Sequence, residues 1–126
     1  MKKAIISSRA PQPIGPYNQA ILKGDTLYMS GQIAMHPDTN VLVLDNIRSE
    51  THQVMTNIKA VLEAAEMGME HIVKTTIFLR TMEDFAAVNE IYATYFKNSV
   101  APARETVAVV GLPKNVNIEI SAIAVR

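Results

Sequence analysis

Two charged residues stand among aliphatic neighbours near the end of the chain. Arg104 lies in APARETVAVVGLP, residues 101–113, and Glu119 lies in VNIEISAIAV, residues 116–125. The first segment reads as a buried strand, and an unpaired arginine inside a sheet would cost several kcal/mol because its charge cannot be removed. We therefore expect an anionic group to meet Arg104.

Two interpretations fit this pair of charges. In the first, Arg104 and Glu119 form a structural ion pair, or Arg104 is exposed at a strand edge. In the second, Arg104 donates two N–H groups to a substrate carboxylate while Glu119 handles a water molecule or a proton. If Val110 pairs with Val116, the charges face opposite sides of the sheet, and a one-residue slip places them on the same side. A site between subunits could unite them even in the first register.

Other residue types offer little catalytic chemistry. The three histidines, His36, His52 and His71, are far apart in the sequence, and none belongs to a metal-binding motif. We interpret them as ordinary surface or boundary residues. The chain has no cysteine, and it contains no GxSxG, P-loop or GxGxxG motif. We therefore expect neither a metal nor a nucleotide cofactor.

Length and charge limit the class of protein. A chain of 126 residues is expected to form one domain, residues 1–126. Twelve basic and twelve acidic residues cancel, so no overall field favours a nucleic acid or a membrane surface as a partner. The N-terminal residues lack the apolar core of a signal peptide, and the absence of cysteine suits a reducing compartment. We expect a soluble, cytoplasmic protein.

Hydrophobic periodicity outlines the elements that must position these charges. It predicts strands over residues 3–7, 17–22, 27–31, 71–79, 103–110 and 116–125, and helices over 47–66 and from 81 to before 101. Gly24 suits the turn of a hairpin between the second and third strands. Asp45 or Asn46 can cap the first helix, and Thr81 and Asp84 have the spacing of a capping box for the second.

This order predicts an α/β fold with a mixed six-stranded sheet and two helices on one face. In the last strand, Ile118, Ile120 and Ala122 point one way, while Glu119, Ile123 and Val125 point the other, so both rows carry aliphatic residues. A sheet face of this kind without a helix would expose an apolar patch. We therefore expect another copy of the chain to cover it, in an oligomer whose size the pattern leaves open.

Several segments resemble the RidA/YjgF family. They are IGPYNQA (14–20), SGQI (30–33), NIKAVLEAA, VKTTIFL, FAAVNEIY and PAR followed by GLPKNVNIEISAIAV, and they occur in the order and at the spacing of that family. The resemblance covers residues 3–126. It implies a chorismate-mutase-like fold and a homotrimer with a cleft at each subunit interface.

The resemblance also implies an activity. RidA-type members are 2-iminobutanoate/2-iminopropanoate deaminases, which hydrolyse enamines and imines such as 2-aminoacrylate to 2-keto acids and ammonia without a cofactor. Pyridoxal-phosphate-dependent dehydratases acting on serine or threonine release these substrates. By this resemblance Arg104 binds the substrate carboxylate and Glu119 orients or activates water. The matching positions that line the cleft are Tyr17, Ser30, Gly31 and Asn89.

The sequence departs from the family pattern beside Arg104. Thr106 stands where many relatives have cysteine, and Glu105 stands where many have serine. We expect Thr106 to contact the substrate and to affect which imine is preferred. Glu66 occupies a position where the first helix often ends in glycine, which shifts the helix end.

Two alternative functions remain open at this point. One is a non-catalytic regulator that binds small carboxylates such as keto acids, and the other is a translation inhibitor with ribonuclease activity. The neutral charge and the absence of paired histidines argue against the second.

Overall fold

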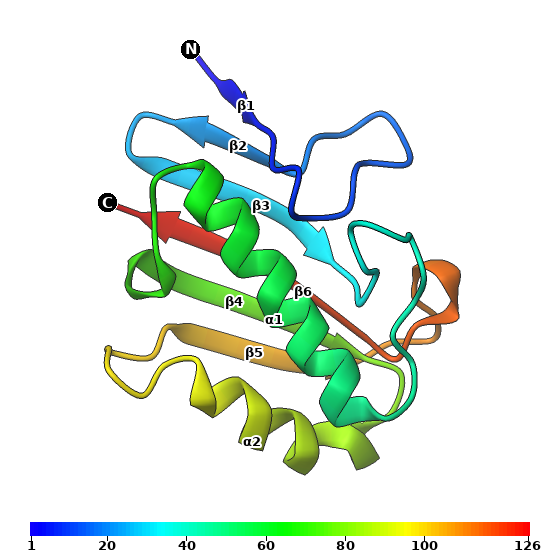
Figure 1. The fold of residues 1–126 in the computed structure, drawn as a ribbon. Coiled ribbons are helices and arrows are strands. Elements are labelled where there is room, and N and C mark those ends of the chain that lie inside the picture. Colours follow the sequence, from blue (N-terminus) through cyan, green and yellow to red (C-terminus); the bar gives the residue numbers. More distant parts are fainter.

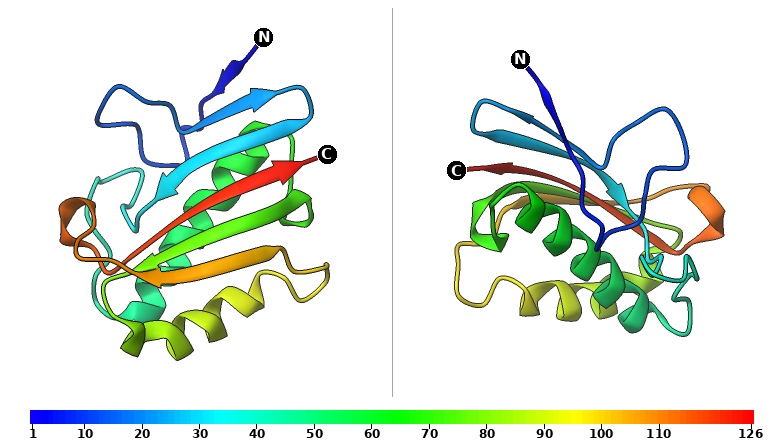
Figure 2. Two further views of the ribbon diagram at one scale, coloured as in Figure 1. Left: turned by 180° about the vertical axis from the view of Figure 1, so that it is seen from behind. Right: turned by 45° about the horizontal axis from the view of Figure 1, so that its top comes forward.

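The chain folds into one mixed sheet with both helices on the same face. In the computed structural model, which describes residues 1–126, six strands are ordered β1-β2-β3-β6-β4-β5. The strands are β1 (Lys3–Ile5), β2 (Ala20–Lys23), β3 (Thr26–Gln32), β4 (Ile72–Leu79), β5 (Ala103–Ala108) and β6 (Ile118–Val125), and the helices are α1 (Ile47–Ala64) and α2 (Phe85–Thr94). Figure 1 shows both helices in front of the sheet, and Figure 2 shows the opposite face without a helix. The predicted fold class is confirmed.

The order of the last strands corrects the sequence analysis. Residues 103–110 and 116–125 are treated there as a hairpin, but β4 lies between them, paired parallel with β5 and antiparallel with β6. A parallel neighbour needs a crossover connection, and α2 supplies it between β4 and β5. The register between Val110 and Val116 therefore does not exist. β5 is an edge strand whose residues are mostly exposed in one chain. The prediction that residues 103–110 form a buried strand is therefore also wrong for a single chain.

The first hairpin forms as expected, with its strands displaced. Lys23 pairs with Thr26, and Gly24 in the turn has φ of 59°. This left-handed conformation carries little steric cost for glycine. Residues 17–19 lie before β2 and remain outside the sheet, which leaves them free to bend toward β3.

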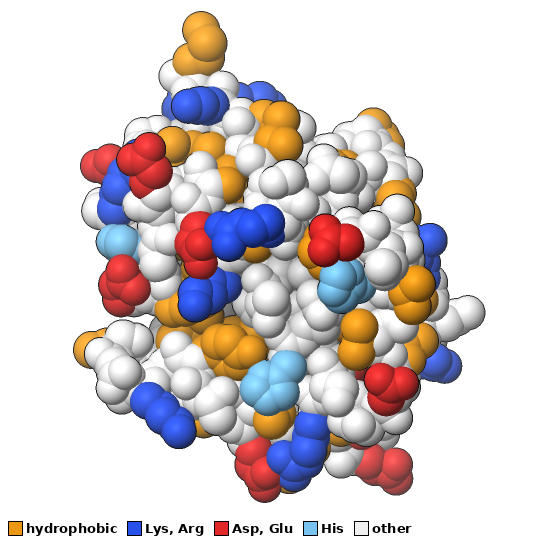
Figure 3. Space-filling model, in the orientation of Figure 1, with side chains coloured by type: hydrophobic (Ala, Val, Ile, Leu, Met, Phe, Trp, Pro, Cys, Tyr) orange, Lys and Arg blue, Asp and Glu red, His pale blue; other side chains and the backbone are white.

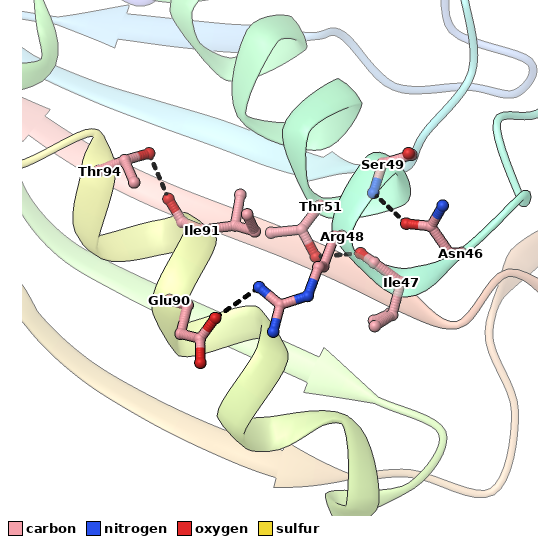
Figure 4. Close-up of polar contacts among 8 residues, drawn as sticks. All are labelled: Asn46, Ile47, Arg48, Ser49, Thr51, Glu90, Ile91 and Thr94. Carbon is pink, nitrogen blue, oxygen red and sulfur yellow. Dashed lines mark hydrogen bonds and ion pairs between the residues drawn. The ribbon is translucent and has the colours of Figure 1, made fainter.

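Helix α1 begins at a side-chain cap and packs beside α2. Asn46 is the cap: its Oδ1 accepts a hydrogen bond of 2.8 Å from the Ser49 amide (Figure 4). Arg48 reaches Glu90 of α2 in an exposed ion pair of 2.5 Å. The cap fixes the first turn of α1, and the ion pair joins the two helices on their outer side.

The second helix starts differently from the prediction. Thr81 Oγ1 accepts from the Glu83 amide and caps a 3-10 turn, Met82–Asp84, after which α2 begins at Phe85. The predicted capping box between Thr81 and Asp84 is therefore wrong. The short turn accounts for the difference because it places one tight turn between the cap and the α-helix.

Alternation along β6 separates the core from the open face. Ile118, Ile120, Ala122 and Ala124 are buried under the helices, as predicted. On the other face Tyr28, Val107 and Val125 keep 51%, 42% and 39% of their surface exposed. Such apolar exposure on one face is typical of a surface that another chain covers. Neither helix combines the length and apolar character needed to cross a membrane.

Candidate active site

The Glu119 carboxylate lies directly over Gly31. A Cβ atom added at Gly31 would come within 2.6 Å of Glu119 Oε2. Strand β3 bulges here: Met29 pairs with Ala122 and Gln32 with Ile120, so two residues of β3 stand between these pairs where β6 has one. The bulge re-aims the strand, and the absent side chain leaves room for the carboxylate.

Burial changes the proton affinity of this glutamate. Glu119 is half-buried, and desolvation raises the pKa of its carboxyl above the ordinary value. No lysine, arginine or histidine of the same chain forms an ion pair with it. A carboxylate with a raised pKa holds a proton more readily, which suits a general base that must take a proton from water.

Two further predicted residues lie next to Gly31. Ser30 Oγ donates a hydrogen bond of 2.6 Å to the Asn18 carbonyl, and the Ser30 amide donates one of 2.9 Å to the Gln19 carbonyl. These bonds hold the loop that carries Tyr17 against the bulge. Tyr17 and Gly31 line the same cavity of about 40 Å³. We call Tyr17, Ser30, Gly31 and Glu119 the glutamate cluster.

Gln19 is a residue that the sequence analysis missed. Its buried side chain accepts from the Ser7 amide at 2.7 Å and donates to the Ser7 and Pro11 carbonyls at 3.1 and 2.9 Å. These bonds fix the proline-rich loop above the cavity beside Tyr17. A glutamine that follows a proline-rich loop gives no periodic signal, so only the folded chain reveals this role.

Arg104 is held by one face of α2. Its Nη1 donates to Asn89 Oδ1 at 2.7 Å, and its Cζ lies 5.1 Å from the ring centre of Tyr92 and 5.6 Å from that of Phe85. We call these four residues the arginine cluster. Residues 85, 89 and 92 are four and three apart, so one helical face presents them together. That spacing is the signal that could have linked Asn89 to the two aromatic residues.

Tyr92 is held in place by strand β4. Its hydroxyl shares a buried hydrogen bond of 2.7 Å with Thr75 Oγ1 of β4. Burial raises the pKa of the Tyr92 hydroxyl, so this group stays neutral beneath the guanidinium. The ring therefore offers Arg104 a rigid π surface, the usual partner of a guanidinium in a cation–π contact.

The intrachain ion pair between Arg104 and Glu119 does not form. Arg104 lies on the helix side of the sheet and Glu119 on the open side, and no carboxylate of the chain pairs with Arg104. The neighbouring Glu105 faces away and contacts Thr76 and, at 3.1 Å, Lys74. Its hydrogen bonds from Thr76 and then Lys74 lower the pKa of its carboxyl. Within one chain Arg104 is exposed on the edge strand β5, as one of the two structural interpretations expected, and any anion that meets it comes from outside this chain.

Thr106 lies on the same side of β5 as Arg104, two residues further along. Its Oγ1 is buried and has no hydrogen-bond partner in the chain. A buried hydroxyl normally has a hydrogen-bond partner, so Thr106 is an exception within one chain. The role of Thr106 in substrate contact stays a prediction.

The three histidines have separate local partners. His52 Nδ1 shares a hydrogen bond with the Tyr95 hydroxyl at 2.9 Å, His71 Nδ1 accepts from the Gly68 amide at 2.9 Å, and His36 Nδ1 accepts from the Asp38 amide at 3.3 Å. Each ring serves its own turn or helix contact. Within one chain the predicted site residues other than Thr106 thus fall into two clusters, and no histidine joins either.

Comparison with known proteins places the chain in a family. The family model described as "Endoribonuclease L-PSP" matches residues 7–126. A RutC family protein of Pyrococcus horikoshii is 49% identical over 126 residues, which cover 100% of this chain and 99% of that protein. A 2-iminobutanoate/2-iminopropanoate deaminase of Dermatophagoides farinae is 48% identical over 124 residues, which cover 98% of this chain and 96% of that protein.

A solved structure agrees in fold over the same extent. The crystal structure of E. coli TdcF with bound serine superposes with a TM-score of 0.95 at 38% identity and covers 98% of each chain. The similarity in sequence and the similarity in fold therefore extend over almost the whole length of the chain. The chain belongs to the endoribonuclease L-PSP family, which is the RidA/YjgF family, and has its chorismate-mutase-like fold.

Proposed function

We propose that the chain is an enamine and imine deaminase that converts 2-iminobutanoate, 2-iminopropanoate and enamines such as 2-aminoacrylate to 2-keto acids and ammonia. The observation that carries this proposal is Arg104, a guanidinium oriented by Asn89 and two aromatic rings yet paired with no carboxylate of its chain. A guanidinium presents parallel N–H groups that match a carboxylate. The name of the Dermatophagoides farinae relative and the serine bound to TdcF support a small amino-acid-derived substrate.

The site is proposed to lie between two copies of the chain. The arginine cluster and the glutamate cluster lie on opposite faces of one sheet, so a single small substrate cannot touch both within one chain. The open apolar face beside Glu119 offers a surface for a second copy. In a homotrimer closed by head-to-tail contacts, each interface would receive Arg104 from one subunit and Glu119 from the next.

Hydrolysis then needs only a site that positions the substrate and water and transfers protons between them. The enamine first moves a proton from nitrogen to carbon and becomes the imine. Arg104 holds the carboxylate, which fixes the imine carbon next to it. Glu119 takes a proton from water as the oxygen bonds to that carbon, and delivers the proton to the nitrogen, giving a carbinolamine.

The second half of the reaction repeats the relay in the same direction, from oxygen to nitrogen. Glu119 takes the hydroxyl proton of the carbinolamine and passes it to the nitrogen, the C–N bond breaks, and ammonia leaves as the C=O bond forms. The atoms balance with one water consumed. The raised pKa of the Glu119 carboxyl favours both uptake steps because it brings the proton affinity closer to that of the reacting groups.

The family model's description raises RNA cleavage as a second activity. The surface on the helix side mixes basic and acidic side chains without a continuous basic region (Figure 3). The histidines have separate partners, as described above. Phosphodiester cleavage by paired histidines therefore has no support in the geometry, and we expect purified protein to leave RNA intact.

The deaminase proposal is tested by keto-acid release. A purified serine or threonine dehydratase supplies the imine, and the early phase of keto-acid formation is followed with and without this protein. We expect acceleration by the parent, none by Arg104→Ala, and normal acceleration by Arg48→Ala, which removes an arginine paired with Glu90 on the helix side.

Equal rates for the parent and Arg104→Ala would contradict the proposal. Binding of 2-ketobutyrate by the parent without any acceleration would instead favour the regulator, because the same carboxylate contact would then serve recognition alone.

A further inference from the structure

Glu50 is a fully buried carboxylate that the proposed reaction does not use. It lies in the first turn of α1 with 0% of its surface exposed, and it takes part in none of the ion pairs of the chain. A buried acid without a cation needs hydrogen-bond donors to replace water. Its partners therefore indicate what it is buried for.

All three donors come from two consecutive residues at the start of β6. Glu50 Oε2 accepts from the Asn117 amide at 2.8 Å and from the Ile118 amide at 3.2 Å, and Oε1 accepts from Asn117 Nδ2 at 2.8 Å. The next residue along the chain is Glu119. The Glu50 carboxylate thus fixes the backbone immediately before the proposed general base.

The segment before β6 needs such a fixed point. Lys114 and Asn115 have φ of 54° and 57°, a left-handed conformation that favours glycine. After this tight turn, β6 must start in the register that directs Ile118 into the core and Glu119 toward Gly31. A one-residue displacement would exchange the two faces of the strand.

The anchor of Glu50 is itself well defined. Asn46 caps α1 through the Ser49 amide, and the Glu50 amide donates to the Asn46 carbonyl at 3.0 Å (Figure 4 shows the cap). The first turn of α1 therefore fixes the position of the Glu50 backbone. Through the Glu50 side chain, it also fixes where β6 starts. The two elements are 67 residues apart in the sequence at this contact.

We propose that Glu50 is a positioning residue for Glu119: it holds the amides of Asn117 and Ile118 and so sets where the Glu119 carboxylate lies against Gly31. This inference rests on the proposed deaminase function. Glu50 touches no substrate. It acts through two backbone amides, on the opposite side of β6 from the Glu119 side chain.

Two substitutions distinguish positioning of Glu119 by Glu50 from a merely structural role of a buried side chain. Glu50→Gln keeps the length and an oxygen that can accept both backbone amides, and the Asn117 side chain can turn its own oxygen toward the new NH₂ group. Glu50→Asp keeps the carboxylate but withdraws it by one methylene. Thr51→Ala is the matched control, because Thr51 is buried in the same turn and bonds only the Ile47 carbonyl, at 2.7 Å.

Steady-state kinetics are measured with imine generated in place by an amino-acid oxidase. We expect Glu50→Asp to lower kcat by on the order of 10- to 100-fold with little change in KM, because misplacement of the base affects the chemical step while Arg104 still binds the carboxylate. Glu50→Gln and Thr51→Ala should stay within about threefold of the parent. Parent-like kcat in Glu50→Asp, or equal losses in Glu50→Asp and Thr51→Ala, would overturn the proposal.

Amide hydrogen exchange keeps the test independent of activity. We expect faster exchange in Glu50→Asp at Asn117 and Ile118 and unchanged exchange in the centre of α1. Unchanged exchange at those two amides would overturn the anchoring role even if the parent proved inactive. An inactive parent would overturn the proposed function and the catalytic part of this inference, and the exchange result would still decide whether Glu50 sets the start of β6.

Discussion

Arg104 and Glu119 lie on opposite faces of the same sheet, with β4 between their strands. Thr75 of β4 stands opposite Arg104, and Phe78 stands opposite Glu119. These two β4 residues are three apart, so their side chains point to opposite faces. The charges therefore belong to different surfaces of one chain, and a shared substrate requires two chains.

Mixed oligomers test this arrangement directly. Arg104→Ala and Glu119→Gln should each be inactive alone. After unfolding and refolding together in equal amounts, they should recover about a quarter of the parent activity, because random mixing gives each head-to-tail interface one chance in four of holding both intact residues. The measurement is keto-acid release per subunit.

The control for mixing is the same pair of variants combined without unfolding. These samples should stay inactive over the time in which subunits do not exchange. Recovery of no activity after refolding, with oligomers of normal size, would mean that both residues must act from one chain, which would contradict a site shared between two subunits.

Gly31→Ala should lower kcat strongly with little loss of stability. The added Cβ would lie 2.6, 2.7 and 2.9 Å from the Oε2, Cδ and Cγ atoms of Glu119, so this side chain must rotate away from the strand, and the backbone can stay in place. We expect kcat to fall by about 100-fold, the usual effect of misplacing a reacting group by an ångström. Kinetics and thermal unfolding are measured on the same samples, with Gly111→Ala as the control because a Cβ there meets no atom within 4 Å. A Gly31→Ala protein with parent kcat would exclude Glu119 as the base in its observed position.

Stability should depend on pH through Glu119. Burial raises the pKa of its carboxyl in the folded state, so the folded protein binds this proton more tightly than the unfolded chain. Stability from this group is present at low pH and is lost as pH rises through the raised pKa. Glu119→Gln, which never ionises, should therefore gain Tm relative to the parent between about pH 4 and pH 8, with the smallest difference at the acid end. A Tm difference that is constant across this range would contradict the raised pKa.

Glu66→Gly should stabilise the fold. Glu66 follows the end of α1 with φ of 58°, and the Met67 and Glu66 amides donate to the Leu62 and Glu63 carbonyls, both at 2.9 Å, as in a Schellman motif. Glycine adopts this conformation without the steric cost, so we expect a gain of about 1 kcal/mol in the free energy of unfolding. Urea unfolding at equal subunit concentration measures it. Lys59→Gly, inside the same helix, should lose about 1 kcal/mol, and a loss in both variants would refute the explanation.

The local elements could be predicted because their signals are local. The β2–β3 hairpin follows from Gly24 between two alternating segments, and the start of α1 follows from a capping residue before an amphipathic stretch. Alternation in β6 assigned Ile118 and Ile120 to the core. Residues two, three or four positions apart determine these features, so the sequence carries them explicitly.

Part of the site could also be predicted. The isolation of Arg104 and Glu119 among aliphatic residues singled out both, and the family segments added Tyr17, Ser30, Gly31 and Asn89. The sequence did not reveal that Phe85 and Tyr92 hold the guanidinium or that Gly31 makes room for a carboxylate. Each of these contacts joins elements that are distant along the chain.

Local patterns therefore predicted most of the helices and strands, the inner face of β6 and the two residues with unmatched charge. That β4 separates β5 from β6, and hence that Arg104 and Glu119 occupy opposite faces, follows from the tertiary fold alone. The physical reason is that strand order depends on a helical crossover and on packing between distant segments, which no local periodicity encodes. The partners of Arg104, Glu119 and Glu50 follow from that order.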